Sequence, residues 1–131
     1  MRERNDLTRG WLKKARSDMT AVDALIAADS FDTACFHSQQ AAERLLKAYL
    51  THFAVTFPPT HNLVKLVELA AGVDASLRSL TAIVEPLTPY AVESRYDDQF
   101  WPRREVAEKA RQLSKEVERA VLGKLPEDVT R

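Results

Sequence analysis

The feature that most constrains the fold is the stretch 31–53, whose apolar and polar positions repeat with the period of an α-helix. Small and apolar residues recur there at steps of three and four, the spacing of a helix face that is buried against other helices. The members of this face are Ala34, Ser38, Ala41, Leu45, Tyr49 and Phe53. Because most of the early members are small, a neighbouring helix can approach closely. The pattern therefore predicts a long helix inside a tight helical bundle.

A second face of this expected helix carries polar side chains at the same spacing. It consists of His37, Gln40, Arg44 and Lys47, called the polar row below. The row places two cations, an imidazole and an amide side by side, as a ligand-binding surface would. It is equally typical of a solvated helix face. Glu43 precedes Lys47 by four residues, a pairing that contributes roughly 0.2–0.5 kcal/mol on an exposed helix.

Amphipathic helical patterns also fill most of the remaining chain, and strand patterns are nearly absent. Further helices are expected at about 8–28, 63–72, 77–91 and 103–123. The candidate caps of the second and third helices are Asp29 or Ser30 and Thr60 or Asn62. Pro86 and Pro89 fall inside the fourth pattern, so a kink or a break is expected there. The segment 94–102 is expected to be irregular.

These patterns predict an all-α fold, a mostly up-and-down bundle of four to five helices in a single domain that covers residues 1–131. Its core is expected at about 8–123. The last helix is expected to turn Val106, Ala110, Leu113 and Val117 inward. The polar C-terminal tail at 124–131 is expected to be frayed.

Composition narrows the classes of function. The 19 basic and 19 acidic residues cancel, so counterion-driven capture of nucleic acid is disfavoured and RNA binding would need a local patch. The chain has no glycine-rich phosphate loop and no CxxC or His-Glu-x-x-His motif, and its three histidines and one cysteine lack metal-ligand spacing. We therefore expect no metal and no cofactor. Cys35 is expected to be a buried hydrophobe.

The apolar runs are too short to span a bilayer, and the first residues are charged rather than typical of a signal peptide. The expected location is cytoplasmic.

The segment 93–102 is the second region dense in chemically capable side chains. Arg95 presents a planar fork suited to phosphate or carboxylate. Tyr96 can stack on a base or pack in the core, and Asp97 and Asp98 can fix Arg95 or accept from a sugar hydroxyl. The structural alternative is an inter-helix connection held by an Arg–Asp pair and aromatic anchors.

His61 lies beside the start of the third expected helix. Two roles of His61 are compatible with this position: it can bind an anion there, or it can hold the loop by a hydrogen bond. His52, near the end of the second helix, receives no functional assignment.

Three ordered motifs, taken together, resemble the HEPN family of small all-α domains, named for proposed nucleotide binding. The motifs are Phe36-His37-Ser38-Gln39-Gln40-Ala41-Ala42-Glu43-Arg44-Leu45-Leu46-Lys47-Ala48-Tyr49-Leu50, then Phe57-Pro58-Pro59-Thr60-His61-Asn62-Leu63, then Ser94-Arg95-Tyr96-Asp97-Asp98. The resemblance spans about 12–121. Asp97 stands where family members usually carry proline.

The resemblance implies a bundle of four to five helices, commonly a homodimer with a cleft between protomers. Many members are encoded beside, or fused to, a minimal nucleotidyltransferase. One branch consists of metal-independent ribonuclease toxins, whose signature is an Arg and a His separated by four to six residues. The windows that would hold this Arg for His37, His52 and His61 are 30–32, 45–47 and 54–56, and none contains one.

Metal-free RNA cleavage requires a base or an acid beside a cation for the phosphate. No histidine follows Arg95, so we expect no ribonuclease of the usual type and assign no catalytic residue. The preferred hypothesis is a non-catalytic HEPN module in a toxin–antitoxin-like two-component system. It binds a nucleotide, a partner nucleotidyltransferase or both, and its candidate residues line one groove near a dimer contact. The candidate ligand-binding residues are Arg95, Tyr96, Asp97, Asp98, His37, Gln40, Arg44, Lys47 and His61.

Two alternatives stay open. One is a divergent metal-independent ribonuclease toxin that pairs Arg95 with His37 or His61. The other is a purely structural dimerisation module in which these residues only cap and pack.

Overall fold

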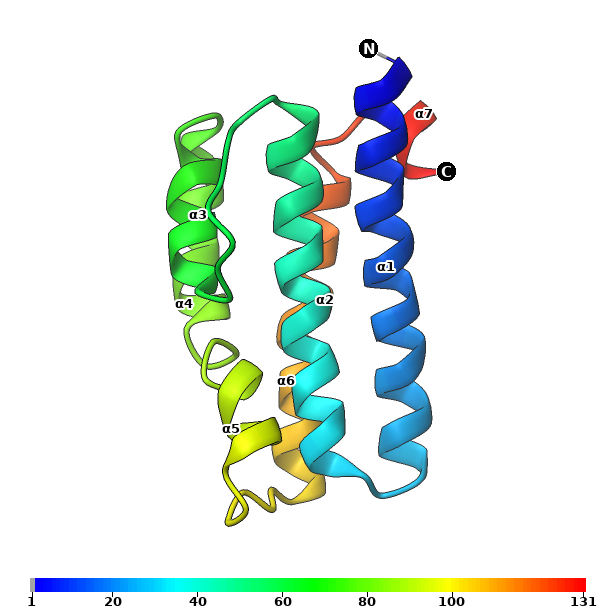
Figure 1. The fold of residues 1–131 in the computed structure, drawn as a ribbon, viewed down its shortest axis with the longest axis vertical. Coiled ribbons are helices and arrows are strands. Elements are labelled where there is room, and N and C mark those ends of the chain that lie inside the picture. The colour runs from blue at the N-terminus through cyan, green and yellow to red at the C-terminus, as the bar shows by residue number, and fades with distance from the viewer. Residues whose placement is uncertain (1) are drawn as a thin grey trace.

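The structure, a computed structural model, describes the backbone of residues 2–131 and the side chains from residue 3 onward. Within that range the regular structure is entirely helical, which confirms the all-α prediction (Figure 1). The elements are α1 (Arg2–Ala27), α2 (Phe31–His52), α3 (Leu63–Ala71), the 3₁₀ helix η1 (Ala75–Leu80), α4 (Thr81–Val84), α5 (Tyr90–Tyr96), α6 (Arg104–Leu122) and α7 (Glu127–Thr130).

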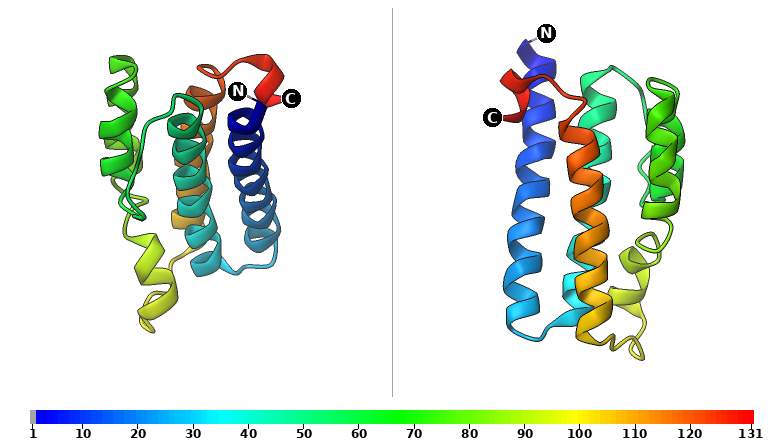
Figure 2. Two further views of the ribbon diagram at one scale, coloured as in Figure 1. Left: turned by 45° about the horizontal axis from the view of Figure 1, so that its top comes forward. Right: turned by 180° about the vertical axis from the view of Figure 1, so that it is seen from behind.

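Helix α2 is the centre of the bundle. Helix α1 runs antiparallel to it on one side, α3 and α4 lie on the other, and α6 packs behind (Figures 1 and 2). Helix α5 extends below α4 and faces the first half of α2. Helix α7 lies beside the first turns of α1. Within residues 2–131, none of the helices combines the length and hydrophobicity that a bilayer-spanning segment requires.

Local sequence signals account for some helix boundaries. The side chain of Asn62 accepts a hydrogen bond from the backbone N–H of Lys65, and this capping bond begins α3. Ser30 occupies the N-cap position of α2, but its hydroxyl bonds the Thr33 hydroxyl and does not cap the backbone. Asp29 adopts the left-handed conformation in the tight turn before α2, with φ of 59°.

The expected start of the first helix at residue 8 is wrong, because α1 already begins at Arg2. The segment 3–7 has no apolar periodicity to reveal a helix, yet it contains neither proline nor glycine to stop one. The Thr8 hydroxyl donates back to the Arg4 carbonyl. Arg9 forms an ion pair with Asp6, three residues earlier. Local bonds of this kind extend the helix backward.

The first face of α2 is buried as predicted at five of its six members, which are Ala34, Ser38, Ala41, Leu45 and Tyr49. Burial raises the pKa of the Cys35 thiol to about 12, with a further contribution from Asp32, so the thiol is inert at neutral pH. The interpretation of the polar row as a solvated face is wrong for two of its four members, whereas His37 and Arg44 stay partly exposed, at 30% and 29%. Gln40 is only 6% exposed and Lys47 only 8%, so both are core side chains.

Two apolar residues depart from their expected places. Phe53 lies beyond the last residue of α2 and is exposed, because the chain turns left-handed at Ala54 and leaves the bundle. Val106 is exposed and Ala107 is fully buried in its place. The inward stripe of α6 therefore runs one residue later than expected at its start.

The fourth expected helix breaks, as Pro86 and Pro89 predict, into η1, α4 and α5. The expectation of irregular structure from residue 94 is wrong for its first residues, because α5 continues to Tyr96.

The C-terminal tail forms α7 instead of fraying. Leu125 and Val129 enter the core, and Arg16 of α1 donates to the carbonyl oxygen of Thr130. Arg16 comes from the opposite end of the chain, so the sequence of the tail alone does not predict this contact.

Candidate functional site

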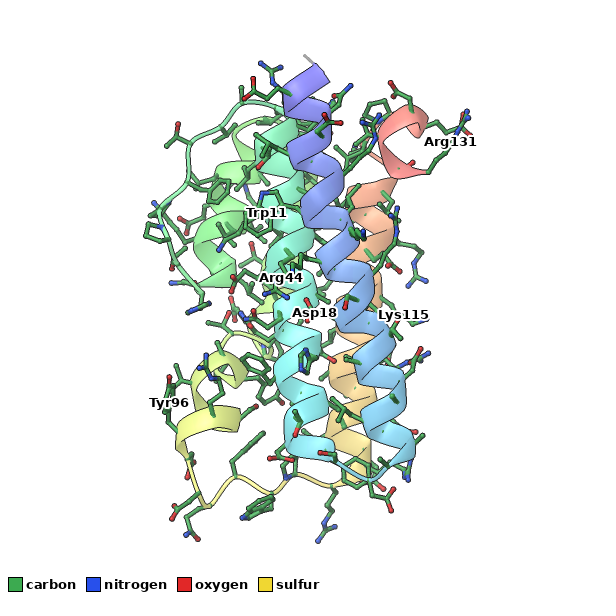
Figure 3. The ribbon with its side chains drawn as sticks, turned by 45° about the vertical axis from the view of Figure 1, so that its right-hand side comes forward. Trp11, Asp18, Arg44, Tyr96, Lys115 and Arg131 are labelled. Carbon is green, nitrogen blue, oxygen red and sulfur yellow. The ribbon has the colours of Figure 1, made fainter. Side chains whose placement is uncertain are left out.

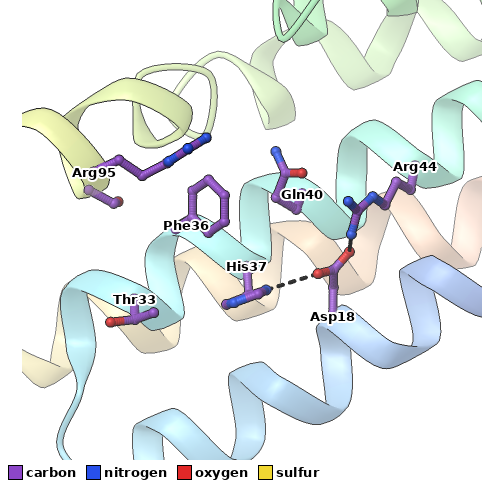
Figure 4. Close-up of a pocket in the computed structure, with 8 residues that line it drawn as sticks. Asp18, Thr33, Phe36, His37, Gln40, Arg44 and Arg95 are labelled. Atoms are coloured by element: carbon purple, nitrogen blue, oxygen red, sulfur yellow. Dashed lines mark hydrogen bonds and ion pairs between the residues drawn. The ribbon is translucent and has the colours of Figure 1, made fainter.

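A pocket of about 520 Å³ opens between α5 and the first half of α2, with α1 forming its floor (Figure 4). All eight of its lining residues carry a polar or aromatic side chain. They are Asp18, Thr33, Phe36, His37, Gln40, Arg44, Ser94 and Arg95. Three helices thus contribute chemistry to one cavity. Figure 3 shows two of these residues, Asp18 and Arg44, along the seam between α1 and α2.

Asp18 organises the floor of the pocket. Its carboxylate is 4% exposed, and Oδ1 accepts from Nδ1 of His37 at 2.9 Å. Its second oxygen, Oδ2, accepts from Nη1 of Arg44 at 2.7 Å. Because Nδ1 of the imidazole is directed at a carboxylate, the other ring nitrogen, Nε2, lies on the opposite edge of the ring and is left for a ligand or a proton. The Asp18 bonds therefore orient both His37 and Arg44.

Arg95 forms the opposite wall. It extends from the last turn of α5 over the ring of Phe36, with its guanidinium carbon 5.5 Å from the ring centroid (Figure 4). The Tyr96 ring lies 5.3 Å from the same carbon. These cation–π contacts hold the guanidinium without neutralising it. Across residues 3–131 no carboxylate comes within ion-pair distance of Arg95.

Gln40 connects the pocket to a second cluster deeper in the bundle. Its Nε2 donates to Oε1 of Gln39 at 2.7 Å, and Nε2 of Gln39 donates onward to Oε1 of Glu43 at 3.1 Å. Both amides belong to α2 and both are buried. A chain of side-chain hydrogen bonds thus runs from the pocket to Glu43.

Glu43 is the centre of that second cluster. Oε2 accepts from the Lys47 ammonium at 2.9 Å, and Oε1 accepts from Nδ1 of His61 at 2.8 Å. Burial acts to raise the pKa of Glu43, but hydrogen bonds from His61, Lys47 and Gln39 outweigh it and lower the pKa. The rings of Trp11 and Phe57 flank the ammonium at 5.6 and 5.8 Å. These contacts tie the connection 53–62 to α2.

The structure brings four of the nine candidate residues into the pocket: Arg95, His37, Gln40 and Arg44. Lys47 and His61 instead belong to the Glu43 cluster. Tyr96 lies on the outer side of α5 and is 72% exposed, so it neither packs in the core nor lines the pocket (Figure 3).

The acidic candidates Asp97 and Asp98 shape the turn after α5. Asp97 accepts from the backbone N–H of Gln99, and the carbonyl of Asp98 accepts from the indole N–H of Trp101. The expected Arg–Asp pair at Arg95 is therefore absent from the described residues, whereas the aromatic contacts of this arginine are present.

Asp18, Thr33, Phe36 and Ser94 line the pocket but were not among the candidates. One signal for Asp18 was present in the sequence. It lies three residues after Ala15 and four before Val22, both inward positions of α1. A carboxylate in a buried stripe requires a partner, so this position marks a polar interior site. Thr33 and Ser94 carry no comparable signal.

No trio of His, Cys, Asp or Glu side chains with the geometry to hold a metal ion occurs in the part of the chain that the structure describes.

Comparison with known proteins assigns the class. The family model of the HEPN domain matches residues 8–125. The chain belongs to the HEPN family. No curated protein sequence matches it.

Two solved structures share the fold. TT1696 from Thermus thermophilus is 25% identical with a TM-score of 0.76, and the match covers 90% of this chain and 98% of that one. ST0689, described as an archaeal HEPN homologue, is 20% identical with a TM-score of 0.72, covering 89% and 96% of the two chains.

Proposed function

We propose that the pocket between α2 and α5 binds the phosphate group of a nucleotide. One observation supports this proposal above the others: the Arg95 guanidinium faces the pocket without a carboxylate partner among the described residues. Arg44 is neutralised by Asp18, so Arg95 supplies the unbalanced positive charge. A planar guanidinium matches two phosphate oxygens at once.

The neighbouring groups suit the same ligand. Gln40, His37 and Arg44 present amide, imidazole and guanidinium groups on one wall, and the aromatic ring of Phe36 lies in the pocket beside Arg95. A nucleotide combines an anion with a planar base, and aromatic and guanidinium planes are the groups on which bases stack.

Isothermal titration with the four ribonucleoside 5′-monophosphates tests the proposal. We expect at least one to bind, and Arg95→Ala to weaken its affinity about tenfold or more, because a charge-assisted bidentate contact is lost. Arg119→Ala, an exposed arginine on α6, is the matched control and should leave affinity unchanged. Absence of binding by the wild type, or equal binding by Arg95→Ala, contradicts the proposal.

A protein partner belongs to the same proposal. Three large apolar side chains, Val92, Tyr96 and Trp101, are exposed within ten residues beside the pocket. Exposed apolar side chains concentrated in one segment suit a protein contact. The family resemblance supplies two partners, a second copy of the chain and a minimal nucleotidyltransferase. Analytical ultracentrifugation measures the dimer, and co-purification with a co-expressed nucleotidyltransferase measures the second partner. We expect Tyr96→Ser and Trp101→Ser to weaken whichever association the wild type shows. If the wild type is monomeric and does not co-purify with the nucleotidyltransferase, the proposed protein contact is contradicted.

The position of His37 favours a second candidate function, metal-independent RNA cleavage. No histidine follows Arg95 in the chain, yet the fold brings His37 into the same pocket. With Nδ1 held by Asp18, Nε2 is oriented for proton transfer, and Arg95 can hold the scissile phosphate. Incubation with RNA in EDTA distinguishes the two functions. Cleavage that is lost in both His37→Ala and Arg95→Ala supports the enzyme, whereas intact RNA with retained nucleotide binding excludes it.

A further inference from the structure

The two consecutive amides of α2, Gln39 and Gln40, are held in fixed orientations. Gln39 is fully buried, and its Nε2 donates to Oε1 of Glu43 at 3.1 Å and to the carbonyl oxygen of His61 at 3.2 Å. A carbonyl oxygen only accepts hydrogen bonds, and the lowered pKa of Glu43 keeps its carboxylate ionised and accepting at neutral pH. Turning the Gln39 amide over would place its oxygen against two acceptors, so Nε2 must face them.

The orientation of Gln39 determines that of Gln40. With Nε2 of Gln39 engaged, Oε1 is presented to Gln40, whose Nε2 donates to it at 2.7 Å. The carbonyl oxygen of Gln40 is therefore turned away from Gln39. Within residues 3–131 no donor reaches that oxygen, although the residue is only 6% exposed and lines the pocket. In Figure 4 the Gln40 side chain rises into the space between Phe36 and Arg44.

This oxygen and Nε2 of a neutral His37 are acceptors in a pocket whose other open groups mostly donate. Arg95 and Arg44 can only donate, and both oxygens of Asp18 already accept from His37 and Arg44. The hydroxyls of Thr33 and Ser94 also line the pocket, but a hydroxyl rotates to donate or accept as its partner requires. A bare phosphate satisfies the donors and leaves the Gln40 oxygen without a partner.

We propose that Gln40 is a specificity-determining residue, whose carbonyl oxygen accepts a hydrogen bond from an O–H or N–H group of the bound ligand. The proposal rests on the phosphate-binding function proposed above for the same pocket. It narrows the ligand to a phosphorylated molecule that carries a donor beside its phosphate, and it disfavours inorganic phosphate. In a nucleotide the donor comes from a ribose hydroxyl or from an amino group of the base.

Titration with AMP and two analogues tests the proposal and distinguishes the two sources. 2′,3′-Dideoxy-AMP lacks the ribose hydroxyls, and purine riboside 5′-monophosphate lacks the exocyclic amine. We expect one of these deletions to weaken binding to the wild type about tenfold, because it leaves the Gln40 oxygen without a donor inside the occupied pocket. In Gln40→Met the same deletion should change affinity less than about twofold, because the acceptor is gone. Thermal unfolding of Gln40→Met checks that the variant is folded.

A second readout needs no variant. On binding AMP, the side-chain carbonyl carbon of Gln40 should move downfield in its NMR spectrum, and inorganic phosphate should not produce this shift. If AMP and both analogues bind the wild type within about twofold while Arg95→Ala weakens all three, the phosphate pocket stands and the role of Gln40 is refuted. If none of the four ribonucleoside 5′-monophosphates binds, the proposed function fails and this inference fails with it.

Discussion

Two clusters beside helix α2 combine the same kinds of side chain, and they differ in what surrounds them. Each has a buried carboxylate that accepts from Nδ1 of a histidine and from a cationic side chain: Asp18 with His37 and Arg44, and Glu43 with His61 and Lys47. In the first cluster the side chains of His37 and Arg44 are 30% and 29% exposed and line the pocket. In the second, the Lys47 side chain is 10% exposed and is flanked by aromatic rings, whereas the His61 side chain is 61% exposed.

The difference shows how one arrangement of residue types serves two purposes. Around Asp18 the cation and imidazole keep surfaces that a ligand can reach, so the carboxylate orients them for binding. Around Glu43 the same groups hold the connection 53–62 against α2, and the Lys47 ammonium has little contact with solvent. We therefore expect changes at Glu43 to affect stability most, and changes around the pocket to affect binding most. The predictions below test this division in order of decreasing effect on stability.

Glu43→Gln should produce the largest loss of stability. It removes the charge opposite a nearly buried ammonium, and breaking a buried pair from one side costs about 3 kcal/mol or more. Urea unfolding of the variant measures the loss. Glu68→Gln, on the exposed side of α3, is the control and should change the unfolding free energy by less than about 0.5 kcal/mol. If both variants change the unfolding free energy by a similarly small amount, the Glu43 cluster contributes no more than an ordinary surface ion pair.

Acid should destabilise the protein in part through the same residue. The pKa of Glu43 is lowered in the folded state from its ordinary value of 4.5, so the folded form binds its proton less readily than the unfolded chain. Its contribution is therefore complete above pH 4.5 and is lost as the pH falls through the lower, folded-state pKa. The unfolding free energy, measured by urea titration between neutral and acidic pH, should fall less steeply in Glu43→Gln than in the wild type. Parallel curves would contradict the assignment.

Asp18→Asn should cost less than the Glu43 change, about 1 kcal/mol, because Arg44 and His37 can turn to water when the charge is removed. Urea unfolding measures this difference beside Glu43→Gln. A loss equal to that of Glu43→Gln would show that the open and the covered cluster have the same energetic role.

Arg95→Ala should have the smallest effect on stability, within about 0.5 kcal/mol, because no carboxylate pairs with this arginine in the described part of the chain. Its effect on nucleotide affinity should be the largest of these variants. Unfolding and titration measured on the same preparation separate the two quantities. A large loss of stability would identify Arg95 as a structural anchor for α5.

Much of the fold follows from local patterns. The spacing of small and apolar residues in 31–53 predicted α2 to within one residue, and Pro86 with Pro89 predicted the break before α5. Asn62, named as a candidate cap, does begin α3. These predictions succeed because helical periodicity, capping and the exclusion of proline depend on residues only a few positions apart.

The pocket was only partly predictable. His37, Gln40, Arg44 and Arg95 were candidates because they are chemically capable residues in two dense segments. Asp18 was not, although it orients two of them, because its partners lie 19 and 26 positions further along the chain. The covering of Lys47 by Trp11 and Phe57 was equally hidden, since three separate segments meet there.

The amino-acid sequence alone determined that this chain is an all-helical bundle with a polar row on its central helix, because those properties arise from side chains three and four residues apart. Only the tertiary structure decided which members of the row are buried, which carboxylate neutralises which cation, and that a histidine shares a pocket with Arg95. The reason is that desolvation and charge pairing depend on distance in space, and the packing of α1 and α5 against α2 creates those distances.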